Sequence, residues 1–145
     1  MLYHLNIILH NTDNNDKLKS VQNEHENILK IREYYKNEFI NAFSEWSKAT
    51  NFSLSFAEGD ESSNIIIKFS NHNPADSDDK KYVVAYTTPD INKNYLKRMN
   101  IIFYSKDPQG NYYSQNQVYN TALHEIAHAL GVMGHSNNKK NIIFV

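Results

Sequence analysis

The chain contains no cysteine and no run of apolar residues long enough to cross a bilayer. The absence of cysteine excludes disulfide bonds and thiolate zinc sites within these 145 residues. The formal net charge is −1 and the basic residues are scattered, so nothing indicates a nucleic acid or a membrane as a partner. The first residues lack a basic segment and a cleavage site, and they predict a strand instead of a signal peptide. We therefore expect an intracellular protein, or a domain that has been processed or excised from a longer chain.

The length suits one domain, which we expect to span residues 1–145 around one hydrophobic core. Alternating or continuous apolar patterns predict strands, and apolar residues three or four apart predict helices. The expected order is a strand, a long helix, four strands and a final helix, at residues 3–9, 23–50, 52–56, 64–69, 82–87, 100–104 and 116–130. This order predicts an α+β fold.

An aromatic-rich stripe runs along the expected long helix. Its members recur at a spacing of three or four residues: Ile28, Ile31, Tyr35, Phe39, Phe43 and Trp46. Such a stripe could contact a cofactor, but we prefer the simpler interpretation that it packs against the core.

Residues that can carry chemistry are concentrated in the last helix and the turn after it. His124 and His128 are four residues apart, so a helix brings both imidazoles to one face. Glu125 lies one step round the helix, close enough to hold a water without being a ligand itself. Gly131 predicts that the helix ends in a left-handed conformation, after which His135 can turn back towards the pair.

Three histidines meet the needs of a catalytic zinc ion, which takes three protein ligands and keeps one position open. Taken singly, His124 or His128 is more simply explained as a polar residue on an amphipathic helix. We favour the metal site because His124, Glu125, His128, Gly131 and His135 fit one coordination geometry together. The chemistry that this set indicates is zinc-assisted hydrolysis.

The run resembles the long zinc motif of the metzincin zinc peptidases, His-Glu-x-x-His-x-x-Gly-x-x-His, in its matrixin-like branch. The matrixin motif has similar residues at the positions of Ala129-Leu130-Gly131 and Gly134-His135-Ser136. One departure is that three residues separate Gly131 from His135, where the family pattern has two. A weaker similarity extends over nearly the whole chain, including residues 43–56.

This resemblance implies a metzincin-like zincin fold, with a twisted mixed sheet of five strands, a long backing helix, an active-site helix and an antiparallel edge strand lining the cleft. It also implies a zinc metalloendopeptidase in which His124, His128 and His135 bind one catalytic zinc ion. Glu125 would be the general base that takes a proton from a zinc-activated water. The expected partner is an extended peptide or protein substrate, and the expected oligomeric state is a monomer.

The substrate is expected to bind as an added strand. By resemblance and by position, the candidate edge strand consists of Val83, Val84, Ala85, Tyr86 and Thr87. Main-chain bonding to such an edge gives affinity without reading a particular sequence. The alternative is an ordinary edge strand that binds no partner.

Other candidate ligands receive simpler interpretations. Matrixin-like enzymes usually carry a structural zinc bound by histidines in the strands that correspond here to residues 83–87 and 100–104, and neither segment contains a histidine. We therefore expect no structural zinc of that kind. His72 is interpreted as solvated, and Asp76, Asp78 and Asp79 as a solvated loop more readily than as a calcium site.

The C-terminal end departs from the family pattern. The family's methionine turn would place a methionine at Ile143, and a family enzyme continues beyond Val145 into a specificity-pocket wall and a closing helix. A truncated catalytic domain, a compact natural variant and a decayed relative that binds metal without turnover all stay open. Two other functions also stay open: an inactive domain that binds zinc and an extended peptide, and a structural domain whose histidines never meet zinc. Because the family is mostly secreted, the resemblance favours an extracellular location.

Overall fold

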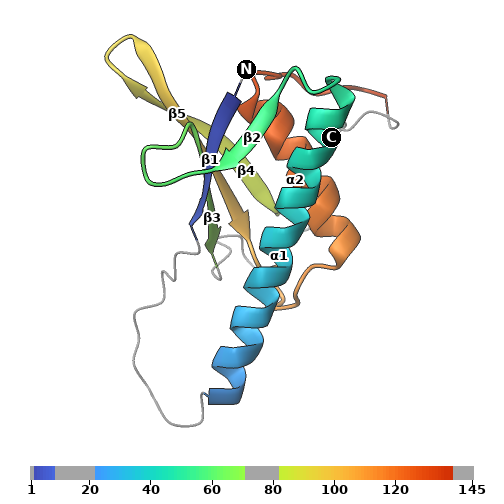
Figure 1. Cartoon of the computed structure of the whole chain (residues 1–145). Helices are drawn as coiled ribbons and strands as arrows, with labels where there is room; N and C mark the ends of the chain where they lie inside the picture. Colours follow the sequence, from blue (N-terminus) through green and yellow to red (C-terminus); the bar gives the residue numbers. More distant parts are fainter. Residues whose placement is uncertain (1, 9–21, 71–81, 139–145) are drawn as a thin grey trace.

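The computed structural model describes residues 2–8, 22–70 and 82–138, with only the backbone described for residues 2–8 and 22–29. Within these residues the chain forms five strands and two helices (Figure 1): β1 (Leu2–Ile8), α1 (Gln22–Ala49), β2 (Ser55–Glu58), β3 (Ile65–Ser70), β4 (Ala85–Asn92), β5 (Tyr95–Tyr104) and α2 (Gln115–Ala129). The prediction of an α+β fold with a mixed sheet and two helices is confirmed.

The strands form one sheet in the order β2-β1-β3-β5-β4. The pairs β1–β2, β1–β3 and β3–β5 are parallel, and β4 is antiparallel to β5. β4 is therefore an edge strand, and among the described residues no strand pairs with its outer side. An edge of this kind offers unpaired main-chain groups to another extended chain.

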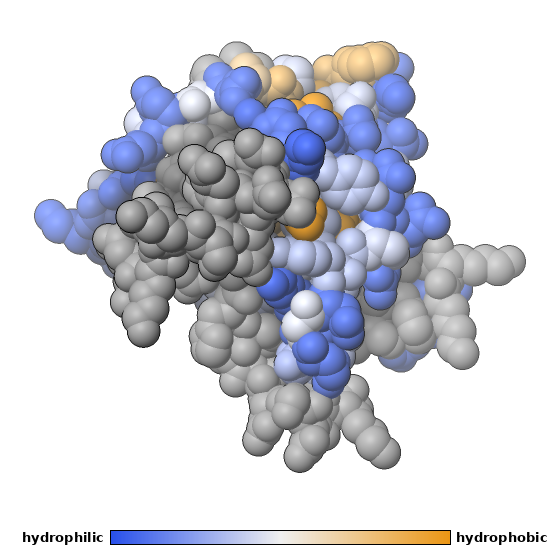
Figure 2. Space-filling model, turned by 90° about the horizontal axis from the view of Figure 1, so that it is seen from below, coloured by the Kyte–Doolittle hydropathy of each residue, from blue (hydrophilic) through white to orange (hydrophobic). Residues whose placement is uncertain are grey.

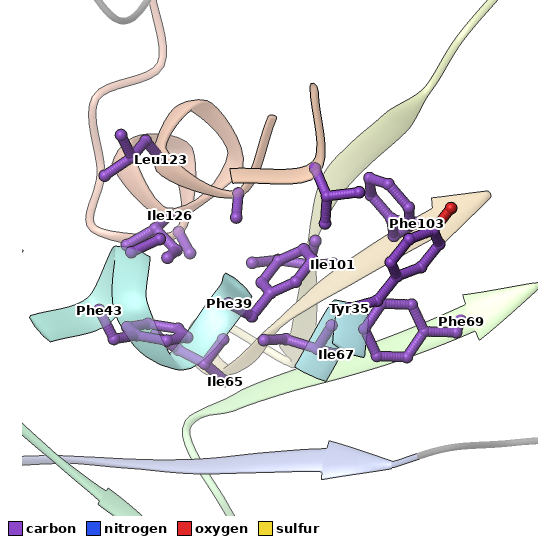
Figure 3. Close-up of a cluster of buried hydrophobic side chains, with 14 of the residues drawn as sticks. Tyr35, Phe39, Phe43, Ile65, Ile67, Phe69, Ile101, Phe103, Leu123 and Ile126 are labelled. Carbon is purple, nitrogen blue, oxygen red and sulfur yellow. The ribbon is translucent and has the colours of Figure 1, made fainter. Parts of the chain in front are cut away.

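Both helices pack against the same side of the sheet, and the hydrophobic core lies between them and the strands (Figures 1 and 3). Tyr35, Phe39 and Phe43 extend from α1 into this core and are almost completely buried. The aromatic stripe predicted along the long helix is thus core packing, with Ile31 and Trp46 partly buried at its ends. The side chain of Ile28 lies outside the described residues.

Alternate residues of the two central strands supply the sheet's half of the core. Buried members that point towards the helices are Ile65, Ile67 and Phe69 of β3 and Met99, Ile101 and Phe103 of β5. This spacing of two is what a strand with one face on the core requires. The arrangement presses α2, which carries the candidate ligands, between α1 and the β4–β5 hairpin.

The end of α1 explains why β2 begins later than predicted. Asn51 and Phe52 adopt left-handed φ values of 50° and 59°. Their N–H groups donate to the carbonyls of Lys48 and Ser47, at 2.9 and 2.8 Å, which is the pattern of a Schellman helix end. Residues 52–54 therefore belong to the helix end and its turn, and the prediction that a strand begins at Phe52 is wrong.

The β4–β5 hairpin corrects three further strand boundaries. Val83 and Val84 precede β4, which then continues through Pro89 to Asn92, beyond the predicted end at residue 87. A proline is tolerated on an edge strand because its missing N–H need not face the neighbouring strand. A two-residue turn with Lys93 at a φ of 56° joins β4 to β5, and β5 therefore begins at Tyr95, before the predicted residue 100.

One face of the molecule is mainly polar where the residues are described. Figure 2 shows one face on which hydrophilic residues predominate and apolar areas are small and separate. Exposed apolar side chains include Ile91, Tyr95 and Leu96 at the tip of the β4–β5 hairpin. Neither described helix has an apolar stretch of the length that a bilayer requires.

Candidate metal centre and active site

The helix that carries the motif is capped at both ends by local sequence. Ser114 is the N-cap, and it forms a capping box with Gln117, so α2 begins at Gln115. At the other end Gly131 adopts a φ of 100°, and the N–H of Val132 donates to the carbonyl of Ala127 at 3.0 Å. This is again a Schellman end, so the prediction that Gly131 terminates the helix is confirmed.

His124 and His128 lie one turn apart on α2 and face each other. Their Nε2 atoms are 3.1 Å apart and their ring centroids are 4.7 Å apart. The turn at Gly131 returns the chain, so that Nε2 of His135 lies 3.2 Å from Nε2 of His128. The extra residue between Gly131 and His135 therefore does not take the third histidine out of the cluster.

The backbone of the turn selects the tautomer of His128. Nδ1 of His128 lies 2.6 Å from the carbonyl oxygen of Val132. A carbonyl oxygen only accepts, so Nδ1 of the imidazole carries the hydrogen and donates it. In the neutral ring, Nε2 is then left with a free lone pair directed at the other two histidines. The turn at Gly131 thus brings His135 to the cluster, and its Val132 carbonyl fixes the tautomer of His128.

The spacing of the three imidazoles fits a tetrahedral metal ion. With zinc–nitrogen bonds of about 2.0–2.1 Å, two ligand nitrogens of a tetrahedron are about 3.3–3.4 Å apart. The nitrogen separations of 3.1 and 3.2 Å are close to that value, and one ligand atom from each of the three histidines lies within 4.8 Å of the others. Three neutral nitrogen donors that leave a position open are the donor set of a catalytic zinc.

Glu125 lies beside this cluster and is 5% exposed. A buried carboxylate needs a donor to compensate for the loss of water. The donor here is Thr87 of β4, whose hydroxyl lies 2.6 Å from Oε2 of Glu125 and 3.2 Å from its backbone oxygen. The shorter contact falls in the range of a hydrogen bond to an ionised oxygen.

A cleft of about 740 Å³ opens over the histidines and runs along the edge strand. Its lining combines the strand segment, the exposed side of α2 and the turn beyond it: Val83, Val84, Ala85, Tyr86, Thr87, Asn120, Thr121, His124, Glu125, His128, Met133 and His135. The cleft thus brings together every residue that the sequence proposed for catalysis, metal binding or substrate binding. Sequence reasoning missed Asn120, Thr121 and Met133, which only their position marks as cleft residues.

Tyr86 faces away from α2, on the opposite side of β4 from Thr87. Its ring lies 6.1 Å from the ring of Tyr104. Burial raises the pKa of Tyr104, and its hydrogen bond with Tyr86 and the repulsion between the two groups raise that pKa further. These tyrosines lie in the strands where the resemblance would place ligands of a structural zinc.

Several sequence predictions fall on residues that the structure does not describe. They concern His72, the aspartates Asp76, Asp78 and Asp79, and Ile143 in the position of the family's methionine. The expectation of no structural zinc also stays a prediction, because residues 71–81 belong to this set.

A helical His-Glu-x-x-His pair, completed by a third histidine beyond a glycine turn, defines a metallopeptidase site of the metzincin class. The sequence model of the matrixin family, peptidase family M10, matches residues 12–145, and the chain belongs to that family. Comparison with curated protein sequences gives no significant match. The molecule is therefore a metallopeptidase of the matrixin family with a histidine triad suited to a catalytic zinc.

Proposed function

We propose that this protein is a zinc-dependent endopeptidase that hydrolyses extended peptides, with Glu125 as the general base. The observation that carries the proposal is the convergence of His124, His128 and His135 beside the Glu125 carboxylate in one cleft. Zinc, when bound, supplies a Lewis acid that polarises a substrate carbonyl and lowers the pKa of water towards neutrality.

The protein residues have separate tasks in this proposal. His124, His128 and His135 hold the ion through their Nε2 atoms, and the Val132 carbonyl keeps His128 in the tautomer that can bind. Glu125 takes the proton of the attacking water and passes it to the leaving amine. Glu125 is buried, so its carboxylate is less solvated than an exposed one and interacts more strongly with the groups beside it.

The substrate in this proposal adds a strand to the outer edge of β4. Ala85 and Thr87 direct their main-chain groups to that edge, whereas those of Tyr86 face Ile102 of β5. Val83 and Val84 extend the same side of the cleft. Main-chain hydrogen bonding aligns the peptide along the cleft, so that its carbonyls pass the histidine cluster. This mode accounts for a site that accepts extended segments of differing sequence.

A second candidate is an inactive family member that binds zinc and an extended peptide. Ile143 favours it, because this residue stands where the family has the methionine of its turn. The two candidates share the metal and the edge strand, and they differ only in turnover.

Cleavage of a mixed peptide library by the purified chain, with zinc and with chelator, separates these candidates. The proposed enzyme cleaves peptides only when zinc is present. Zinc binding without cleavage would establish the inactive candidate, and a chain that takes up no zinc would exclude both.

Replacing Glu125 with glutamine tests the assignment of the base. We expect Glu125→Gln to keep one zinc per chain and to lower kcat by about 100- to 10,000-fold, the usual range for removing a general base. Glu33→Gln is the matched control, because Glu33 is exposed on α1 and is not one of the residues that line the cleft. A zinc-loaded Glu125→Gln variant with the parent rate would remove Glu125 from the mechanism.

Three properties of the whole protein complete the proposal. We infer a single domain over residues 1–145 and a monomer in solution, and we infer an extracellular site of action by analogy with a mostly secreted family. Light scattering of the purified chain measures the mass, and a stable dimer would contradict the monomer.

A further inference from the structure

The carboxylate of Glu125 is held from the neighbouring strand. The hydroxyl of Thr87, which lies 38 residues earlier in the sequence, is 2.6 Å from Oε2 of Glu125. Among the described residues, Thr87 is the only side chain that forms a hydrogen bond with the Glu125 carboxylate. The bond is to Oε2, and Oε1 has no protein partner within the same residues. The two oxygens of the carboxylate therefore have different surroundings.

Thr87 is itself held firmly. It pairs with Ile101 in the β4–β5 ladder, and Ile101 is completely buried. Ala85 and Thr87 are partly buried on the side of β4 that faces α2, whereas Tyr86 and Thr88 are exposed on the other side. Threonine branches at Cβ, which restricts its first side-chain torsion. The backbone register and the stiff side chain together fix the position of the hydroxyl.

We propose that Thr87 is a positioning residue for catalysis, whose hydroxyl binds Oε2 of Glu125 and so orients the carboxylate with Oε1 left to accept the proton. This inference rests on the proposed function, because it concerns the base of that reaction. A base that can rotate spends part of its time outside the reactive geometry, and small displacements of reacting groups lower the rate strongly.

The same contact links substrate binding to catalysis. Thr87 belongs to the edge strand that lines the cleft, and its side chain contacts the base while its main chain lies on the edge available to a peptide. A change of the side chain alone leaves the main-chain edge intact. We therefore expect loss of the hydroxyl to lower kcat and to leave KM nearly unchanged.

Three variants isolate the hydroxyl. Thr87→Val keeps the size and the branching at Cβ but removes the hydrogen-bond donor, and Thr87→Ser keeps the donor. Thr88→Val makes the same chemical change one residue along the strand, where the side chain is exposed on the opposite face. For each variant, kcat and KM are measured on one fluorogenic peptide, together with zinc content and thermal midpoint.

We expect Thr87→Val to lower kcat about tenfold with KM within twofold, with parent zinc content, since misorientation removes only part of the contribution of a general base. Thr87→Ser should recover most of the parent kcat, and Thr88→Val should equal the parent. A Thr87→Val variant with parent kcat, or a Thr87→Ser variant as slow as Thr87→Val, would overturn the proposal. An inactive parent would instead overturn the proposed function.

A second measurement does not depend on turnover. Crystal structures of the parent and of Thr87→Val report the position of the Glu125 carboxylate directly. The proposal expects one ordered conformation in the parent and a rotated or multiple conformation in the variant. An unchanged carboxylate in Thr87→Val would refute the positioning role, whatever the activity of either protein.

Discussion

Replacing Tyr35 with phenylalanine should destabilise the fold at neutral pH and should make its stability less sensitive to alkaline pH. The Tyr35 hydroxyl accepts from the Tyr113 backbone N–H at 2.9 Å, and lies 3.0 and 3.2 Å from the carbonyls of Ser105 and Tyr113. It thereby ties α1 to the segment between β5 and α2. The ring itself packs edge-on against Phe103 at 5.4 Å, a contact that phenylalanine keeps.

The expected loss of unfolding free energy at neutral pH follows from the hydrogen bonds that the Tyr35 hydroxyl makes. Phenylalanine removes the hydroxyl that accepts from the buried Tyr113 N–H and donates to the Ser105 carbonyl, and removing one partner of a buried hydrogen bond costs about 1–3 kcal/mol of unfolding free energy. We therefore expect Tyr35→Phe to be less stable than the parent by about that amount at pH 8.

The pH dependence follows from the pKa of Tyr35. Burial raises this pKa from 10.0 to about 12, and the hydrogen bond from the Tyr113 backbone partly opposes that rise. Because the folded pKa lies above the unfolded one, the stabilisation is complete below pH 10 and is lost as the pH rises towards 12. The parent should lose about 1.4 kcal/mol by pH 11 from this group, whereas phenylalanine cannot ionise.

Urea unfolding of both proteins at pH 8 and pH 11, without metal, measures these differences. Trp46 is a suitable probe, because it is the one tryptophan of the chain and its indole N–H donates to the carbonyl of Leu123 on α2. The stability gap between the parent and Tyr35→Phe should narrow between the two pH values. A gap that stays constant, or a variant as stable as the parent at pH 8, would refute this reasoning.

The remaining predictions concern the core, the helix end and the metal. Phe39→Ala should cost about 3–5 kcal/mol of unfolding free energy, and Ile40→Ala on the exposed side of the same helix should change urea stability by less than about 1 kcal/mol. Gly131→Ala forces a side chain into a φ of 100° and should cost about 1–2 kcal/mol, with weaker zinc binding by calorimetry, while Gly134→Ala, outside the left-handed region, should have little effect. Zinc at about 100 times its Kd should stabilise the protein by about 2.7 kcal/mol, so chelator should lower Tm and added zinc should restore it. A Tm that is the same with zinc and with chelator would contradict the metal site.

Local patterns predicted α1 and α2 well, for a physical reason. A helix is closed by hydrogen bonds between near neighbours, so residue spacing and capping residues determine most of it. Ser114 and Gln117 start α2 and Gly131 ends it, and each acts within a few residues. The pair His124 and His128 was predictable in the same way.

Strand boundaries were less predictable because they depend on partners elsewhere in the chain. Pro89 stays within β4 because it lies on an edge strand opposite Met99, where its missing N–H need not face the neighbouring strand. Lys93 forms the tight turn after β4 without glycine. Neither property follows from nearby residues. The segment 82–84 had a strand-like sequence, but its ladder with β5 begins only at Ala85.

By itself, the sequence determined the ligand types, their helical spacing, the glycine turn and the apolar stripe of α1, because these depend on contacts between residues close in the chain. Only the tertiary structure decided that His135 returns to within 3.2 Å of His128 and that Thr87 meets Glu125 across 38 residues. The Thr87–Glu125 contact arises because the shared core packs α2 against the β4–β5 hairpin, and such packing is a property of the whole fold. The return of His135 depends on the conformation that the chain adopts after Gly131.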